Sequence, residues 1–186
     1  MKQNTSFAFY FVVFSLLMLY GCSNAEKEPL TVDNILTTPD EYVGQTVTVK
    51  GKATHVCAKS GMKLFLEGSR EVHTIRVESN STLGKFDKAC VDNEVVVKGI
   101  LVEEKITEAD LKKMEEEIVE NRSVTHGEDG EACETEQKAE GVAAGSSEMD
   151  RVNQFRERLA ERKASEGKDY LSFYHIAANS YSVVEK

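Results

Sequence analysis

Alternating apolar and polar residues predict five strands in this sequence. They are QTVTVKGKATHVC at 45–57, MKLFLEG at 62–68, VHTIRVES at 72–79, NEVVVKGILVEEKI at 93–106 and DYLSFYHIAANSYSVVE at 169–185. Alternation of this kind is typical of strands that bury one face. The first and fourth strands are long and carry a central glycine, Gly51 and Gly99, where a small barrel bends to close on itself. The pattern predicts a mainly β fold.

The facing of the first strand decides where its last side chains lie. If the alternation is unbroken, His55 and Cys57 share a face with Val47, Val49 and Ala53. A bulge or sharp coil is expected at Gly51, and past such a point the two faces can exchange. The sequence leaves the facing of His55 and Cys57 open.

Two amphipathic segments interrupt the strand pattern between the fourth and fifth strands. Thr107 and Asp110 have capping-box spacing ahead of the first, and Ser147 and Asp150 have it ahead of the second. Each segment carries a narrow apolar stripe at helical spacing. The stripe residues are Leu111, Met114 and Ile118 in the first segment and Val152, Phe155 and Leu159 in the second. We expect an antiparallel helical hairpin inserted between strands 4 and 5; the alternative is that the two helices lie on the barrel.

The inserted segment, residues 107–166, is also the acidic part of the chain. It holds 17 acidic and 9 basic residues, a net charge of −8, whereas the full chain has a net charge of −9. Between the two helices, residues 122–146 are polar and nearly without large apolar side chains, so we expect a mobile loop there. The remaining barrel residues are 30–106 together with 167–186.

The N-terminus has the layout of a bacterial lipoprotein signal peptide. Lys2 precedes an apolar run from Phe7 to Tyr20 that is too short to span a bilayer permanently. Leu19-Tyr20-Gly21-Cys22 resembles the lipobox, in which the cysteine thiol is acylated with fatty chains such as palmitate. This predicts a signal peptide at 1–21, a lipidated Cys22, a tether at 22–29, and anchoring in the cell envelope, facing the periplasm or the surface. Ser23 after the lipidated cysteine favours the outer membrane.

The strand and turn pattern resembles a known small-barrel family. DEYVGQTVTVKG and the following HVCAKSGMK are similar to the bacterial OB-fold proteins grouped with the tRNA-anti-like domains. The short helical link TLGKFDKAC between the third and fourth strands also has its place in an OB barrel. The resemblance implies a five-stranded OB-type barrel and says little about activity. In OB folds the connection between strands 4 and 5 borders the ligand face, so the acidic insertion is expected beside it.

The turn after the first strand is the candidate ligand site. Backbone amides at a Ser-Gly turn between two lysines can receive an anion, and the residues concerned are His55, Cys57, Lys59, Ser60, Gly61 and Lys63. The alternative is a solvated turn whose lysines protect the strand edge. Nucleic acid is not an expected ligand, because the mature chain, without Lys2, carries 22 basic and 32 acidic residues.

Metal binding and disulfide formation are the other chemistries these residues permit. His55 and Cys57, with His175 on the last strand, form a possible zinc or copper set; the alternative is a hydrogen-bonded core histidine beside a buried thiol. Three cysteines remain after lipidation, and a Cys57–Cys90 disulfide is a further possibility. No nucleophile elbow or glycine-rich phosphate loop is present.

These observations favour a non-catalytic, membrane-anchored binding protein for a ligand or partner protein in the envelope. Two alternatives remain open at this point. One is a metal or haem handling protein that uses His55, Cys57 and His175. The other is a structural component of an envelope complex that contacts its partners through the acidic helices.

Overall fold

The computed structural model describes residues 28–70, 73–124 and 133–184. The predicted signal peptide and Cys22 lie outside the described residues. In chain order the elements are β1 (Leu30–Thr31), α2 (Val32–Thr37), the 3-10 turn η2 (Pro39–Glu41), β2 (Thr46–Val56), β3 (Lys63–Glu67), β4 (Thr74–Glu78), the 3-10 turn η3 (Lys88–Cys90), β5 (Glu94–Thr107), α3 (Glu108–Val124), α4 (Glu134–Ala139), α5 (Glu148–Glu166) and β6 (Tyr170–Val183).

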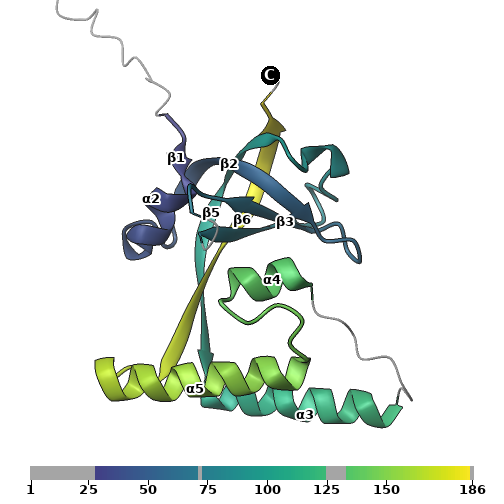
Figure 1. The fold of residues 1–186 in the computed structure, drawn as a ribbon. Coiled ribbons are helices and arrows are strands. Elements are labelled where there is room, and N and C mark those ends of the chain that lie inside the picture. The colour runs from purple at the N-terminus through teal and green to yellow at the C-terminus, as the bar shows by residue number, and fades with distance from the viewer. Residues whose placement is uncertain (1–27, 71–72, 125–132, 185–186) are drawn as a thin grey trace, which may run out of the picture.

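Five strands, β2 to β6, close into a barrel (Figure 1). β2, β3 and β4 form an antiparallel meander, β4 pairs in parallel with β6, and β6 pairs antiparallel with β5. The ring closes because β5 also pairs antiparallel with β2, with Val47 opposite Gly99. This strand order is that of an OB-like fold and confirms the predicted five-stranded barrel with helices inserted between its fourth and fifth strands. The short β1, which pairs in parallel with β2, was not predicted.

A register shift in β2 settles the facing that the sequence left open. Burial alternates from Val47 to Ala53, and the pairing with β3 then shifts between Ala53 and His55. Past the shift Val56 is buried, while His55 and Cys57 are only partly buried and lie on the outer side. The face exchange was expected at Gly51, two residues too early. Gly51 instead lets α2 approach, because a Cβ there would lie 2.9 Å from the Val32 side chain.

Apolar side chains fill two separate cores. The barrel core includes Val32 and Ile35 of α2, the inward side chains of the strands, and Cys90 of η3. The second core lies in the insertion and contains the predicted stripes of both helices, Leu111 and Ile118 from α3 and Val152, Phe155 and Leu159 from α5. A helix of this kind has too narrow a stripe to be stable alone, so each helix depends on the other.

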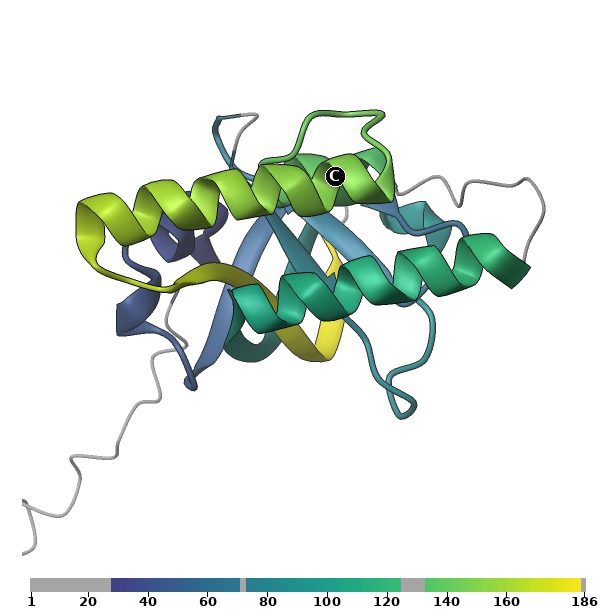
Figure 2. The ribbon, with the colours of Figure 1, turned by 90° about the horizontal axis from the view of Figure 1, so that it is seen from below.

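The ends of β5 and β6 continue past the barrel as a two-stranded ribbon that carries the insertion. The ribbon pairing runs on to Thr107 and Tyr170, and α3 and α5 lie antiparallel across its end (Figures 1 and 2). Both predicted capping boxes form: Thr107 bonds with Asp110, and Ser147 bonds with Asp150. The helical hairpin is therefore as predicted.

The segment at 122–146, expected to be a mobile loop, contains a short helix in its second half. Glu134–Ala139 forms α4, and the buried Gln137 amide donates to the Ser146 carbonyl and accepts from the Gly145 amide. A polar composition indicates solvent exposure when the polar groups bond to water, but here they bond to the protein itself. Residues 125–132 lie outside the described residues.

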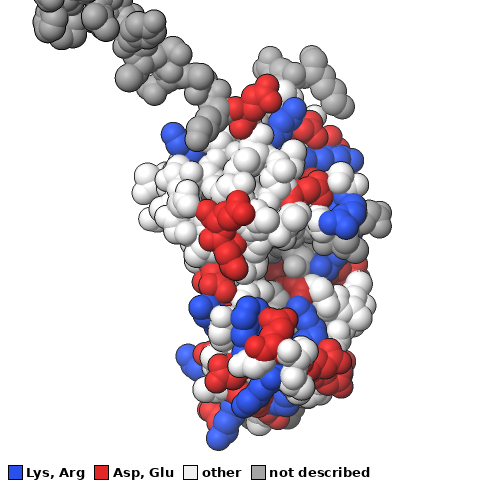
Figure 3. All heavy atoms as spheres, turned by 90° about the vertical axis from the view of Figure 1, so that its left-hand side faces the viewer, with Lys and Arg blue, Asp and Glu red and all other residues white. Residues whose placement is uncertain are grey.

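Charged side chains gather on the insertion. Figure 3 shows acidic and basic side chains covering its surface, while the side of the barrel above is mostly uncharged.

Among the described residues, none of the helices combines the length and apolar character that a bilayer span requires.

Candidate functional site

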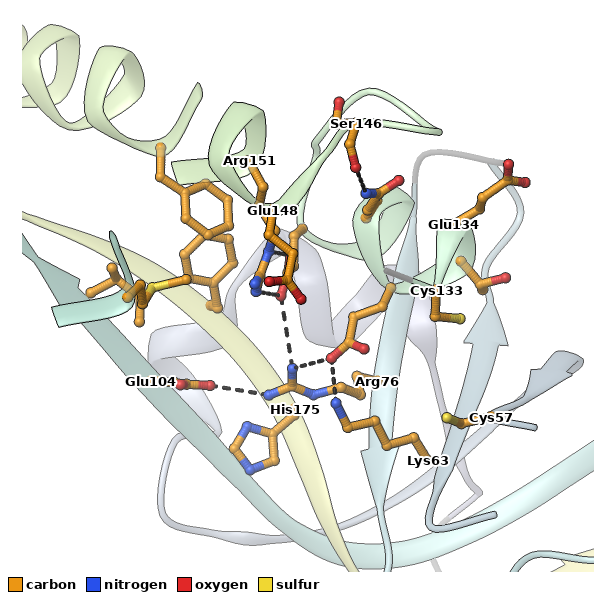
Figure 4. A pocket seen from close by; sticks show the side chains of 18 of the residues that line it. Cys57, Lys63, Arg76, Glu104, Cys133, Glu134, Ser146, Glu148, Arg151 and His175 are labelled. Carbon is orange, nitrogen blue, oxygen red and sulfur yellow. Dashed lines mark hydrogen bonds and ion pairs between the residues drawn. The ribbon is translucent and has the colours of Figure 1, made fainter. Parts of the chain in front are cut away.

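A cleft of about 1440 Å³ separates the barrel from the helical insertion (Figure 4). One wall is the outer face of β3 and β4 with the turn that follows β2. The opposite wall is α4 with the facing side chains of α3 and α5. In OB folds the face of the second and third strands, bordered by the loops after strands 1 and 4, is the usual ligand face. The cleft lies on that face, and the insertion covers it.

The structure brings most of the predicted ligand residues to the cleft wall. His55, Cys57, Lys59, Ser60 and Lys63 line it. The register shift in β2 is the cause, because it turns the first two of these away from the core. The sixth predicted residue, Gly61, does not line the cleft. Gly61 has φ of 69° and its carbonyl accepts a hydrogen bond from the Phe86 amide, so it shapes the turn from behind.

An arginine of β4 holds the two walls together. The Arg76 side chain is 15% exposed, and its guanidinium lies 3.0 Å from both Glu78 and Glu104. Its Nη1 lies 3.2 Å from Glu136 and 4.0 Å from Glu140, both contributed by α4. A planar guanidinium with five donors suits several carboxylates at once. Arg76 therefore links β4, β5 and α4 through charge.

Lys63 is a second cation that joins the barrel to α4. Lys63 Nζ lies 2.5 Å from Glu136 Oε1. Burial of Glu136 opposes its charged form, but the Lys63 hydrogen bond and the charges of Lys63, Arg76 and Arg151 outweigh burial, so its pKa lies below the usual value. Both oxygens of Glu140 accept from Arg151 at 2.6 Å. Burial likewise opposes the charge of Arg151, and its hydrogen bonds to Glu140 outweigh that cost, so its pKa is raised.

His175 also lines the cleft, but it does not form a metal site with His55 and Cys57. Its Nε2 lies 3.6 Å from Glu78, and its buried Nδ1 has no hydrogen-bond partner among the described residues. Burial is the main cause that lowers its pKa, against the opposing charge of Glu78. In the described part of the chain no group of three or more His, Cys, Asp or Glu side chains is placed to hold a metal ion. The zinc or copper alternative therefore has no geometric support.

The possible Cys57–Cys90 disulfide is not formed in the structure. Both thiols are free, and so is that of Cys133. Cys90 is fully buried in the barrel core, where burial raises the pKa of its thiol. Cys57 lies on the cleft side, where the Ser60 hydroxyl lowers its thiol pKa by hydrogen bonding. The register shift in β2 has put the two sulfur atoms on opposite sides of the barrel wall.

Several residues of the cleft escaped sequence reasoning. In the sequence nothing distinguishes Arg76 from the other lysines and arginines of the barrel. The carboxylates of α4 lie in the segment that was predicted to be a mobile loop. A signal for α4 is present, since Glu136 and Glu140 are four residues apart and Cys133 precedes a run without glycine or proline. Nothing in the sequence indicates that α4 lies against β4.

No protein-family model matches this sequence, and no curated protein matches it. The OB-like fold is therefore established by the strand order, and the finer tRNA-anti-like grouping has no support from a related sequence.

The depressed pKa of Glu136 makes a prediction about acid stability. A carboxylate whose pKa is lower folded than unfolded adds stability that is present above the unfolded pKa, about 4.3 for glutamate, and is lost as the pH falls through the folded pKa. We expect Glu136→Gln to lower the free energy of unfolding by about 2 kcal/mol at pH 7 and by much less at pH 3, measured by urea denaturation. Glu116→Gln, on the exposed face of α3, is the control. An equal loss from Glu136→Gln at both pH values would contradict the charge argument.

Proposed function

We propose that this protein is a non-catalytic binding module of the bacterial envelope and that it binds a segment of a partner protein in the cleft. The observation that carries the proposal is the cleft itself, whose two walls come from the barrel and from the insertion. Its volume of about 1440 Å³ exceeds the roughly 300–1000 Å³ of pockets for small ligands. A chain segment with several side chains fits this space better than one small molecule.

The charge of the lining favours a basic partner segment. The basic lining residues are Lys59, Lys63, Arg76, Lys105, Lys113 and Arg151, and the acidic ones are Glu78, Glu104, Asp110, Glu117, Glu134, Glu136, Glu140 and Glu148. Six positive and eight negative side chains give the cleft a net charge of −2. Charge complementarity of this kind selects partners and speeds their association.

An apolar end completes the cleft. Ile106, Met114, Phe155 and Phe173 line it where the ribbon meets the two helices. The Phe155 and Phe173 rings pack with centroids 4.9 Å apart, so this end of the cleft is continuous with the core of the insertion. Burial of an apolar anchor supplies most of the free energy of a protein interface. The partner segment is therefore expected to combine an apolar anchor with basic side chains.

Nucleic acid is not proposed as the ligand. Lys63 and Arg76, two cations of β3 and β4 on the ligand face, are already paired with carboxylates. Phe65, the aromatic residue of β3, is fully buried and offers no surface for base stacking. The anchoring of this module through an acylated Cys22 in the outer membrane is part of the proposal and rests on the lipobox-like sequence.

Synthetic peptides test the cleft proposal. We expect a fluorescent decapeptide of alternating lysine and leucine to bind the purified protein, and decapeptides of glutamate with leucine or lysine with serine to bind much more weakly. Glu117→Lys reverses a charge in the cleft wall and should weaken binding about tenfold, or about 1.4 kcal/mol, measured by fluorescence anisotropy.

The matched control is the neighbouring substitution Glu116→Lys, which makes the same charge change on the exposed face of the same helix. It should change the affinity less than twofold. If both variants weaken binding equally, attraction to the overall negative charge of the protein explains the result, and the cleft is not the site.

A further inference from the structure

Two of the free cysteines face the same cleft from its opposite walls. Cys57 follows β2 on the barrel side, and Cys133 stands immediately before α4 on the insertion side. Figure 4 shows Cys57 on the barrel wall and Cys133 on the insertion wall, both drawn on the side of the cleft away from Glu104. The third free cysteine, Cys90, is fully buried in the barrel core and has no access to the cleft.

A short series of hydrogen bonds joins the backbones of these two cysteines. The Cys57 amide donates to the Lys63 carbonyl at 2.9 Å, which closes the turn between β2 and β3. Lys63 Nζ donates to Glu136 Oε1 at 2.5 Å across the cleft. The Glu136 amide in turn donates to the Cys133 carbonyl at 2.8 Å. The Lys63–Glu136 ion pair therefore holds the start of α4 beside the turn that carries Cys57.

We propose that Cys57 and Cys133 form a disulfide across the cleft when the protein meets a low-molecular-weight disulfide, and that this bond joins α4 covalently to the barrel. The proposal does not depend on the function proposed for the cleft. It also accounts for the three cysteines that remain if Cys22 is acylated, since the buried Cys90 is the one left over once the cleft pair is bonded.

The reaction is two successive thiol–disulfide exchanges. The Cys57 thiolate attacks one sulfur of the small disulfide, forms a mixed disulfide and releases one small thiolate. The Cys133 thiolate then attacks the Cys57 sulfur, forms the protein disulfide and releases the second small thiolate. The two protein thiols lose two electrons and two protons, and the small disulfide is reduced to two thiols.

The surroundings of Cys57 make it the attacking thiol. Hydrogen bonds from the Ser60 hydroxyl and backbone, with the nearby charge of Lys63, lower its pKa against the effect of burial. A larger thiolate fraction speeds the first exchange. Cys90 does not compete, because burial raises the pKa of its thiol and shields it from the oxidant.

Thiol counting with peptide mapping tests this proposal. The full chain carrying Cys22→Ser is incubated with oxidised glutathione, denatured and titrated for free thiols. The count is expected to fall from three per chain to one. Tryptic digestion without reduction should yield a linked pair of the peptides 53–59 and 123–138, and the peptide 89–98, which contains Cys90, should remain a free thiol.

Two matched variants distinguish the possible outcomes. Cys133→Ser should stop the reaction at the mixed disulfide, so that peptide 53–59 carries glutathione, while Cys90→Ser should still give the linked pair. Circular dichroism confirms that each variant is folded. A linked pair that contains peptide 89–98 overturns the proposal, and so does a chain carrying only Cys22→Ser that keeps glutathione on Cys57 without forming the protein disulfide.

Discussion

Gly99→Ala is expected to lower the free energy of unfolding by about 3 kcal/mol or more, the upper range for forcing extra atoms into a packed site. A Cβ at Gly99 would lie 2.3 Å from the Ala177 carbonyl oxygen and 2.7 Å from the Ile176 side chain. The backbone of β6 cannot rotate away from this contact as a side chain would. The substitution therefore forces β5 and β6 apart in the region where β5 also pairs with β2 to close the barrel.

Urea denaturation followed by circular dichroism measures this loss, and Gly145→Ala is the control. A Cβ at Gly145 meets nothing within 4 Å, but its φ is 75°. Only backbone strain then opposes the alanine, at a cost of about 1–2 kcal/mol. A loss at Gly99 no larger than that at Gly145 would show that the strands can separate slightly without opening the barrel.

Arg76→Ala is expected to cost about 3 kcal/mol of stability, because it removes the cation shared by a cluster of four carboxylates, of which Glu136 and Glu140 are only 20% and 9% exposed. Glu78, Glu104, Glu136 and Glu140 all lie within 4.0 Å of the guanidinium, and the Arg76 side chain is only 15% exposed. Without Arg76 these carboxylates repel one another, and α4 loses a main contact with β4. The loss should shrink at pH 4, where protonation relieves the repulsion.

Arg156→Ala is the matched control for this prediction. Arg156 also contacts two carboxylates, Glu108 and Glu115, each at 2.9 Å, but its side chain is 35% exposed. Exposed ion pairs contribute about 0–1 kcal/mol. If Arg76→Ala costs the same at pH 7 and at pH 4, packing of the arginine stem and not its charge stabilises the contact with α4.

The cleft shows why its residues could be predicted only in part. The turn after β2 was found because its residues are close together in the sequence, and a Ser-Gly turn between lysines has a local chemical meaning. The opposite wall was missed because Glu136 lies 60 residues from Arg76, and their contact depends on how the insertion folds back. Polar residues that are buried by such contacts look the same in the sequence as polar residues of a solvated loop.

The choice of a disulfide partner for Cys57 also depends on structure that the sequence does not show. The sequence suggested Cys90 as its disulfide partner because both cysteines lie at strand ends of the barrel. A shift of register between Ala53 and His55 turned Cys57 to the cleft, where Cys133 lines the opposite wall. Side chains of a strand alternate between its two faces. A single register shift therefore moves every side chain after it to the opposite face and gives it different neighbours.

The sequence by itself determined the five strands, the barrel, and the capped helices of the insertion, because strand alternation, capping boxes and apolar stripes are local patterns that extend over a few residues. Only the tertiary structure decided which face His55 and Cys57 occupy, that α4 lies against β4, and that the insertion covers the ligand face of the barrel. These features depend on pairing register and on ion pairs between distant segments, and no local pattern in the chain records them.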